Sequence, residues 1–179
     1  MKGRVFAVVG PSGAGKDTLL AGAVAACPAL HWARRTISRV EVGGGEPFEG
    51  VTVEEYDFLS ISGVFALEWP AHGLRYGIRK GEFSGLAQGQ YVLFNGSRAA
   101  LAQALEMFAD LTVLRISAPS KVLAERLAAR GRETTGEIEA RLARASYDVP
   151  DGMPVIDIAN DDTPAVGIAR LLAALQVRG

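Results

Sequence analysis

The run Gly10-Pro11-Ser12-Gly13-Ala14-Gly15-Lys16-Asp17 carries the residue types that bind phosphate. Its glycines let successive backbone N–H groups turn inward around an anion, and the lysine that follows can place a cation on the phosphates. The apolar run Val5–Val9 precedes it, and a helical stretch beginning at Thr18 follows it. This order of strand, loop and helix is the context of a P-loop, because the helix N-terminus adds unpaired donors. We therefore predict that this run binds ATP, with Lys16 acting on the β- and γ-phosphates.

Asp17 departs from the usual P-loop pattern, in which a serine or threonine hydroxyl at this position contacts Mg²⁺. A carboxylate beside a triphosphate is repelled unless a cation lies between them. Either Asp17 helps to hold Mg²⁺, directly or through water, or Thr18 supplies the hydroxyl. The sequence does not distinguish between them, so Asp17 and Thr18 are both candidate Mg²⁺ ligands.

Arginines gather in two parts of the chain, and each group has two interpretations. Arg34, Arg35 and Arg39 follow one another closely near the end of an expected strand. They are either an ordinary solvated edge or an oxyanion clamp, since the planar guanidinium suits phosphate. The second group lies in expected helices, near several glutamates. Its arginines either form ion pairs with these glutamates along a solvated helix face or bind phosphate. The group comprises Arg126, Arg130, Arg141 and Arg144.

Polar groups also occur where a binding site is expected. In the segment His72–Ile78, His72, Arg75 and Tyr76 stand among glycines, an unusual composition for a core strand, although a lone histidine is as often structural as functional. Asn95-Gly96-Ser97-Arg98 directly follows the apolar run Tyr91–Phe94. The carboxyl ends of parallel strands are where open α/β sheets bind ligands.

The composition favours a single globular domain over residues 1–179, since the chain is 49% hydrophobic and 22% charged. A net charge of −1 gives no broad basic surface for nucleic acid or anionic membrane. Cys27 is the single cysteine, and no apolar run approaches the length of a membrane span. We expect a cytoplasmic protein with a small-molecule substrate, no nucleic-acid partner and no membrane partner. The sequence does not determine its oligomeric state.

Periodic apolar stretches alternate between strand and helix along the chain. We expect a helix from the P-loop to about residue 26, ended by Pro28, a strand over 31–38, and a capping box at Thr52–Glu55 that opens a helix. Thr163-Pro164 is an N-cap and first-turn pair for the last helix. The alternation predicts a three-layer α/β fold with a mostly parallel five-stranded sheet. Residues of about 39–80 and 131–147 are expected to be excursions from this core.

With these motifs in place, nearly the whole chain resembles the guanylate-kinase-like branch of the P-loop nucleoside monophosphate kinases. The resemblance implies an acceptor-binding insertion at about 39–80 and a lid at about 131–147. Gly10–Lys16 matches the P-loop of that family, and Leu67-Glu68-Trp69 with Tyr76-Gly77 matches its acceptor motif. Asn160-Asp161 matches its adenine-contacting loop. The residues that match its lid are Arg126-Leu127, Arg130-Gly131, Glu133, Ile138 and Arg141-Leu142.

The chain departs from guanylate kinases at two acceptor positions. The loop Glu46-Pro47-Phe48-Glu49-Gly50 lacks their tyrosine, and Asn95-Gly96-Ser97-Arg98 stands where they carry acidic residues that read guanine. A site built to hydrogen-bond a base loses most of its selectivity without those groups.

The chain is more similar to the ribose 1,5-bisphosphate phosphokinase family of bacterial phosphonate utilisation. The matching segments are Gly15-Lys16-Asp17, Arg34–Arg39, Gly44-Gly45-Glu46, Phe65-Ala66-Leu67, Ala71–Gly77, Asn95–Arg98 and Arg130–Glu133. Glu68 instead resembles the guanylate-kinase residue, which keeps guanylate kinase or another nucleoside monophosphate kinase as the alternative.

The family resemblance implies transfer of the γ-phosphoryl group of Mg·ATP to ribose 1,5-bisphosphate, giving 5-phosphoribosyl 1-diphosphate and ADP. It implies catalytic roles for Lys16, Arg130 and Arg141, and ATP contacts for Arg126 and Asn160. The expected substrate-binding residues are Arg34, Arg35, Arg39, Glu68, His72, Arg75, Tyr76, Asn95, Ser97 and Arg98.

A rival from another class is a non-catalytic scaffold module that keeps this fold without turnover. The intact Gly15-Lys16 pair and the arginines of the lid argue against it, because a module without turnover has no physical need of them. Formation of ADP in a coupled assay distinguishes the two.

Overall fold

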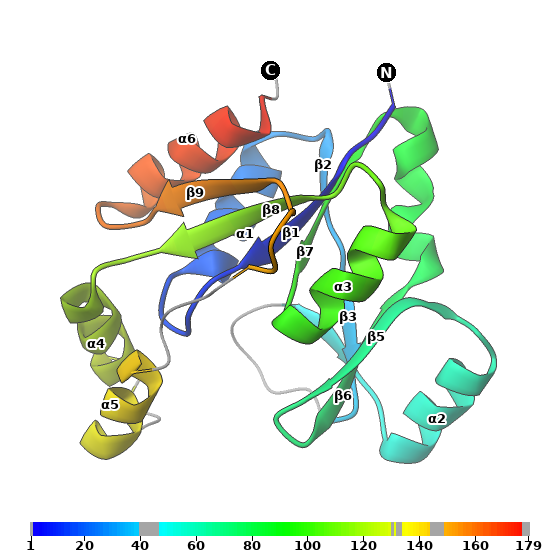
Figure 1. The fold of residues 1–179 in the computed structure, drawn as a ribbon, viewed down its shortest axis with the longest axis horizontal. Coiled ribbons are helices and arrows are strands. Elements are labelled where there is room, and N and C mark those ends of the chain that lie inside the picture. Colours follow the sequence, from blue (N-terminus) through cyan, green and yellow to red (C-terminus); the bar gives the residue numbers. More distant parts are fainter. Residues whose placement is uncertain (1, 40–46, 130, 132–133, 144–148, 177–179) are drawn as a thin grey trace. The chain divides into compact units, whose positions relative to one another are not determined.

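In the computed structural model of the chain, strand β1 (Val5–Val9) is the expected apolar strand, and all five of its residues are buried. A continuous apolar run is typical of a parallel strand covered on both faces. It belongs to a five-stranded sheet with the strand order β2, β7, β1, β8, β9 (Figure 1). The structure describes residues 2–39, 47–129, 131, 134–143 and 149–176.

The chain divides into two compact units, the first formed by residues 1–7 and 29–111 and the second by residues 8–28 and 112–179. The first unit contains β2 (Leu30–Trp32), β3 (Arg35–Ile37), β4 (Phe48–Gly50), α2 (Val53–Ile61), β5 (Phe65–Ala71), β6 (Leu74–Arg79), the 3-10 helix η1 (Lys80–Gln88), β7 (Tyr91–Asn95) and α3 (Arg98–Met107). The second contains α1 (Lys16–Ala26), β8 (Thr112–Ser117), α4 (Ser120–Ala129), α5 (Thr135–Ala143), β9 (Val155–Ala159) and α6 (Pro164–Leu175).

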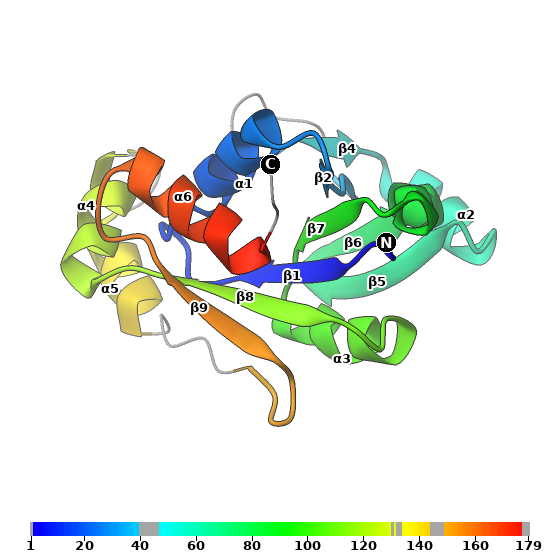
Figure 2. The same ribbon diagram turned by 90° about the horizontal axis from the view of Figure 1, so that it is seen from above.

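In the second unit, β8 and β9 pair in parallel, with Val113 opposite Val155 and Ser117 opposite Ala159. Helices α1 and α6 lie side by side (Figure 2). Thr163 caps α6 as expected, because its Oγ1 accepts a hydrogen bond from the Val166 N–H at 3.4 Å. The predicted α/β fold with a mostly parallel five-stranded sheet is confirmed.

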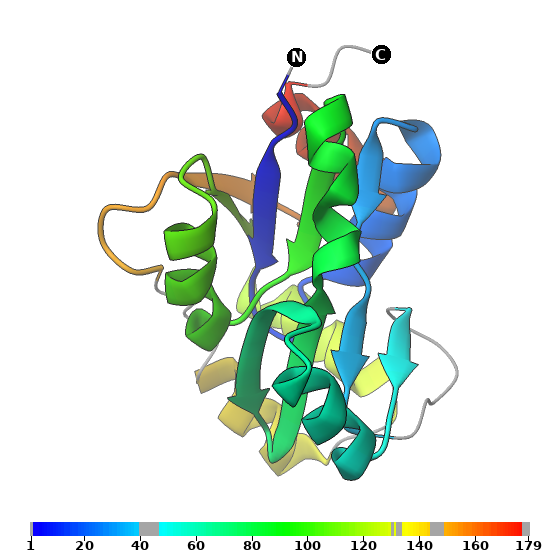
Figure 3. The same ribbon diagram turned by 90° about the vertical axis from the view of Figure 1, so that its right-hand side faces the viewer.

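A second sheet in the first unit, with the order β4, β3, β6, β5, was not foreseen from the sequence. Helix α2 lies against this sheet (Figure 3), where the Tyr56 hydroxyl donates to the Tyr76 carbonyl at 2.8 Å. The predicted capping box of α2 is present: the Glu55 N–H donates to Thr52 Oγ1 at 3.1 Å, and the Thr52 N–H donates to a Glu55 carboxylate oxygen at 2.8 Å.

The expected strand over 31–38 was wrong as a single strand. The chain forms β2, which pairs with β7, and then β3, which pairs with β6 and β4 in the other sheet. At the transition, the Ala33 N–H still donates to the Leu93 carbonyl at 2.8 Å, and the Arg34 N–H donates to the Glu82 carboxylate at 3.0 Å. These two bonds satisfy the backbone where the chain leaves one sheet for the other.

The segment His72–Ile78 forms a turn and strand β6. His72 and Gly73 link β5 to β6 and have φ values of 52° and 72°, with Ala71 paired to Leu74 on either side. A two-residue hairpin turn of this kind requires positive φ at both positions. His72 is therefore placed by the hairpin, at an exposed position.

Among the helices of the described ranges, none is long and apolar enough to span a membrane. The domain prediction, one domain with an acceptor-binding insertion and a lid, stays a prediction. Much of the expected loop over 43–47 lies outside the described residues.

Candidate active site

The phosphate-binding loop, Gly10–Lys16, connects β1 to α1 through three glycines with positive φ. Their φ values are 148° at Gly10, 85° at Gly13 and 87° at Gly15. A Cβ at Gly10 would collide with the Ile116 carbonyl, and one at Gly13 would lie 3.3 Å from the Leu123 carbonyl oxygen. The loop therefore needs glycine for its conformation and for its close packing on neighbouring backbone.

Lys16 begins α1, and its side chain returns over the phosphate-binding loop. Its Nζ donates to the Gly10 carbonyl at 2.8 Å and to the Pro11 carbonyl at 3.1 Å. This places an ammonium group beside the loop at the N-terminus of a helix of 11 residues. Backbone donors, the helix dipole and a cation together make an anion site of the kind that holds the phosphates of a nucleotide.

The predicted metal ligands follow directly in the first turn of α1. Asp17 is partly exposed and Thr18 is exposed. No cluster of three or more metal-ligating side chains occurs in the described part of the chain. A carboxylate or hydroxyl beside a phosphate site suits Mg²⁺, which is bound through one or two protein oxygens together with phosphate oxygens and water.

Two predicted nucleotide-binding residues meet the phosphate-binding loop at one backbone carbonyl. The Asn160 amide donates through Nδ2 to the Ala14 oxygen at 2.7 Å, and Arg126 donates through Nη1 to the same oxygen at 3.4 Å. Arg126 lies in the last turn of α4, whereas Asn160 directly follows β9 and is 4% exposed. The expectation of an adenine contact for Asn160 came from the family resemblance alone.

The two predicted catalytic arginines of the lid are described only in part. Arg130 lies outside the described residues. Arg141 lies within α5, and the position of its side chain is likewise outside the described part of the structure. Their roles stay predictions.

In the first unit, several predicted acceptor residues lie around Tyr76. Its ring stacks on Trp69, with centroids 5.7 Å apart and planes 8° apart, and the Arg35 guanidinium lies 5.2 Å from its centroid. Arg39 lies 4.6 Å from the Phe48 ring centroid, and the register pairs Arg35 with Phe48. A guanidinium over an aromatic face is attracted by the ring quadrupole, so these rings help to fix where Arg35 and Arg39 lie.

Other predicted acceptor residues have structural partners. Arg75 forms an ion pair with Asp57, and Glu68 accepts a hydrogen bond from the Ser60 hydroxyl at 3.2 Å. The Glu68 N–H donates to Gln103 in α3 at 2.9 Å. Tyr56 lies near Glu68, and its burial, followed by the Glu68 charge, raises the pKa of the Tyr56 hydroxyl well above its usual value. Glu68 is thus anchored against α2 and α3.

The residues that follow β7 occupy the expected strand end. Asn95 is 4% exposed, and Ser97 precedes α3 without capping it through its side chain. The Ser97 hydroxyl oxygen is buried and has no hydrogen-bond partner among the described residues. Arg98 is the first residue of α3, and its side chain is outside the described part of the structure.

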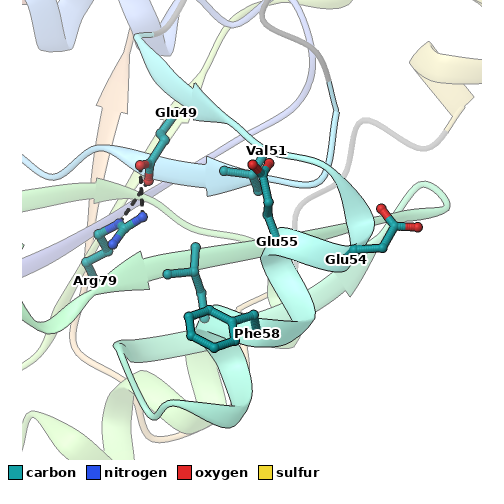
Figure 4. A pocket seen from close by; sticks show the side chains of 7 residues that line it. Glu49, Val51, Glu54, Glu55, Phe58 and Arg79 are labelled. Atoms are coloured by element: carbon teal, nitrogen blue, oxygen red, sulfur yellow. Dashed lines mark hydrogen bonds and ion pairs between the residues drawn. The ribbon is translucent and has the colours of Figure 1, made fainter.

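The sequence analysis missed the contact between Glu49 and Arg79 in the first unit. Glu49 accepts two hydrogen bonds from Arg79, at 2.9 and 2.8 Å, and one from the Thr36 hydroxyl at 2.6 Å. Glu49 and Arg79 border a pocket of about 470 Å³ beside α2, where they point toward each other while Glu54 points away (Figure 4). Partial burial acts to raise the pKa of Glu49, but the hydrogen bonds and the charges of Arg79 and Arg34 outweigh it, so the pKa lies below its ordinary value. The only sequence signal was the position of Arg79 at the end of a strand.

Solved structures with the same fold include kinases. A guanylate kinase from Anaplasma phagocytophilum matches with a TM-score of 0.66 at 17% identity, covering 99% of this chain and 88% of that one. A gluconokinase from Sinorhizobium meliloti matches with a TM-score of 0.53 at 15% identity, covering 97% and 91%. No protein-family model matches the chain.

Among curated relatives, ribose 1,5-bisphosphate phosphokinase PhnN of Ruegeria sp. is 46% identical over 177 residues, covering 98% of this chain and 93% of the relative. The bifunctional ribose 1,5-bisphosphokinase-thymidine phosphorylase of Azorhizobium caulinodans is 46% identical over 176 residues, but the chain spans 25% of its length. The fold and the phosphate-binding loop define a P-loop kinase with a guanylate-kinase-like fold. Within that class, the chain belongs to the ribose 1,5-bisphosphate phosphokinase family.

Proposed function

We propose that this protein transfers the γ-phosphoryl group of ATP to an oxygen of the 1-phosphate of ribose 1,5-bisphosphate. The bond between the γ-phosphorus and the bridging oxygen of ATP breaks, a bond from that phosphorus to the acceptor oxygen forms, and ADP leaves. The product is 5-phosphoribosyl 1-diphosphate. The observation that carries the donor half is the Lys16 ammonium held over the phosphate-binding loop at the start of α1. The relatives named ribose 1,5-bisphosphate phosphokinase support the acceptor half.

Charge rather than proton transfer is the main obstacle in this reaction. An acceptor phosphate is anionic near neutral pH, so its oxygen attacks without a strong general base. The transition state is loose and spreads negative charge over the transferred group, which cations must stabilise. In our proposal Lys16 acts on the β- and γ-phosphates, and Arg130 and Arg141 add positive charge from the lid.

Asp17 and Thr18 are the residues that would hold Mg²⁺. When bound, this ion would supply positive charge that neutralises the phosphates. Their oxygens at the first turn of α1, next to Lys16, fit such an ion. A requirement for ATP is consistent with a cytoplasmic setting, which we include in the proposal.

For the acceptor, we propose that stacked and strand-end arginines bind its two phosphates. Arg35 and Arg39 lie on aromatic faces in the first unit, and Arg98 begins α3. The further candidates for phosphate contact are Arg34 and Arg75. Tyr76, Asn95, Ser97 and His72 supply groups suited to ribose hydroxyls.

The test is ADP formation with Mg·ATP and a panel of ribose 1,5-bisphosphate, GMP and ribose 5-phosphate. We expect kcat/KM for the bisphosphate to exceed that for GMP by at least about tenfold, the roughly 1.4 kcal/mol that one lost polar contact supplies. A preference for GMP would replace the proposal with guanylate kinase and make Glu68 a base contact. A lack of turnover with all three would favour a different acceptor or a non-catalytic module.

A further inference from the structure

Asn160 is bound to the rest of the second unit through both its backbone and its side chain. Its N–H donates to the Ser117 carbonyl at the end of β8 at 2.7 Å, which fixes where the residue lies. Its side-chain amide donates to the Ala14 carbonyl of the phosphate-binding loop, also at 2.7 Å. Because the residue is 4% exposed, this contact is shielded from competing water.

Two glycines leave the space that the Asn160 amide occupies. A Cβ at Gly15 would collide with Asn160 Nδ2, and a Cβ at Gly167 in α6 would lie 2.6 Å from Asn160 Oδ1. The amide therefore fits between the phosphate-binding loop and α6 with little freedom to rotate. Among the described residues, Asn160 Oδ1 has no hydrogen-bond partner, which leaves the donation from Nδ2 to Ala14 as the polar contact of the side chain.

The contact determines the direction of one peptide group in the loop. In a trans peptide the carbonyl of Ala14 and the N–H of Gly15 belong to the same plane and point in opposite directions. An amide that holds the Ala14 oxygen on the buried side of the loop consequently turns the Gly15 N–H to the other side. Inward-turned N–H groups of this kind are what such a loop offers to phosphate.

We propose that Asn160 is a positioning residue of the phosphate-binding loop, which holds the Ala14 carbonyl so that the Gly15 N–H faces a bound phosphate, and that it does not contact the nucleotide base. Arg126 supports the same carbonyl through a longer bond of 3.4 Å. The inference rests on the proposed use of a nucleoside triphosphate. It replaces the adenine contact expected for this residue from the family resemblance.

The decisive variant is Asn160→Asp, which keeps the size of the side chain but replaces the Nδ2 donor by an oxygen. Near neutral pH a carboxylate then faces the Ala14 carbonyl, so the loop should lose its conformation for binding. We expect the affinity for ATP and for inorganic triphosphate to fall by the same factor, at least about tenfold. A residue that contacts adenine would lower the affinity for ATP and leave that for inorganic triphosphate unchanged, which would overturn the proposal.

The pH dependence gives a second readout that a structural defect alone would not produce. In the Asn160→Asp variant, the introduced carboxyl can donate its O–H to the Ala14 oxygen once it is protonated. Burial raises the pKa of such a carboxyl, and the charge of Arg126, which donates to the same oxygen, acts in the opposite direction. The triphosphate affinity of Asn160→Asp, relative to that of the wild type at each pH, should recover as the pH falls from about 8 to 5.5. A ratio that stays constant over this range would contradict the donor role.

A matched control and a second variant separate this effect from misfolding. Gln176→Glu makes the same change of amide to carboxylate at an exposed position at the end of α6, and should leave both affinities and their pH dependence unchanged. Gly167→Ala places a methyl group against the Asn160 amide and the Leu19 side chain, so it displaces the amide without altering it, and should lower both affinities while the thermal transition is still cooperative. If Asn160→Asp and Gly167→Ala both bind triphosphate as the wild type does, the inference is wrong whatever the acceptor. If the wild type binds triphosphate but phosphorylates no acceptor of the panel, only the proposed function fails.

Discussion

Lys16 is the residue on which the donor half of the proposed reaction depends most. Its ammonium is within 3.1 Å of two loop carbonyls, so it is already held beside the phosphate site before a nucleotide arrives. A charge that needs no reorganisation stabilises a transition state more effectively than one that must be moved into place.

Lys16→Ala should lower kcat by about 10²- to 10³-fold, the order of effect of losing one preorganised donor, while the fold is retained. The measurement is steady-state ADP formation, with circular dichroism to check the fold. Lys121→Ala, which removes an exposed lysine of α4, is the matched control and should keep the wild-type rate. Near-normal activity of Lys16→Ala would remove the phosphate-binding loop from the mechanism.

Glu49 shows how a residue contributes to stability without a proposed role in the reaction. Three hydrogen bonds from Arg79 and Thr36 hold its pKa below the ordinary value of 4.5 in the folded state, although partial burial acts in the opposite direction. A carboxyl whose folded-state pKa is lowered stabilises the fold fully above the unfolded-state pKa. That contribution is lost as the pH falls below about 4.5 and through the lowered folded-state value.

Glu49→Gln should therefore lower the free energy of unfolding at pH 7 by about 1 to 2 kcal/mol, the scale of hydrogen bonds to a charged group. The difference from the wild type should shrink below pH 4.5, because the wild-type carboxyl becomes protonated first in the unfolded state and, at lower pH, in the folded state. Urea unfolding at pH 7 and pH 3.5 measures both. Glu54→Gln, which changes an exposed carboxylate lining the same pocket, should change stability little at either pH. An equal loss for Glu49→Gln at both pH values would mean that the carboxylate charge contributes nothing.

At the scale of elements, the proposed mechanism places its lid arginines at two helices: Arg141 is within α5, and Arg130 follows α4 in sequence. Arg126 is in the last turn of α4 and reaches the Ala14 carbonyl, so α4 is connected to the phosphate-binding loop within the second unit. Residues that meet the transferred group only after a lid closes contribute to the transition state more than to binding.

Arg130→Ala and Arg141→Ala should accordingly lower kcat by about a hundredfold, with a much smaller change in KM for ATP. Arg-to-Lys changes should also be poorly tolerated if the contact with phosphate is bidentate. Arg115→Ala, which removes an arginine paired with Asp157 across β8 and β9, serves as the control. Weaker ATP binding with an unchanged kcat would instead make the two lid arginines ordinary binding residues.

Elements with local signals were predicted well, and elements that depend on distant pairing were not. The capping box of α2 and the Thr163 cap of α6 are set by residues three positions apart, and both are present. The division of the expected strand over 31–38 into β2 and β3 depends on partners far along the chain, in β7 and β6. The second sheet was missed for the same reason, since the periodicity of one segment does not say which sheet it joins.

For the whole molecule, the sequence predicted the fold class, and both the topology and the relatives confirm it. The phosphate-binding loop could be predicted because its chemistry lies in one continuous run. The role inferred for Asn160 could not, because the hydrogen bond joins residues 146 positions apart in sequence. The anchoring of Glu68 by Ser60 and Gln103 was hidden for a similar reason, since its hydrogen-bond partners come from two different helices, α2 and α3.

The acceptor preference depends on the molecule as a whole, because a bisphosphate needs cations for two phosphates at once. The strand end Asn95–Arg98 offers an amide, a hydroxyl and a cation, which suit sugar hydroxyls and a second phosphate rather than a guanine base. If Arg98 binds the 5-phosphate, its effect must depend on whether the acceptor carries that group.

Arg98→Ala should lower kcat/KM for ribose 1,5-bisphosphate by about ten- to a hundredfold, the loss of one charged hydrogen bond, with the Kd for ATP unchanged. With ribose 1-phosphate, which lacks the 5-phosphate, the wild type and the variant should react at nearly equal, low rates. Arg4→Ala, directly before β1, controls for the loss of one positive charge and should leave both ratios at their wild-type values. An equal loss with both acceptors would place Arg98 at the 1-phosphate, and no loss with either would remove it from the acceptor site.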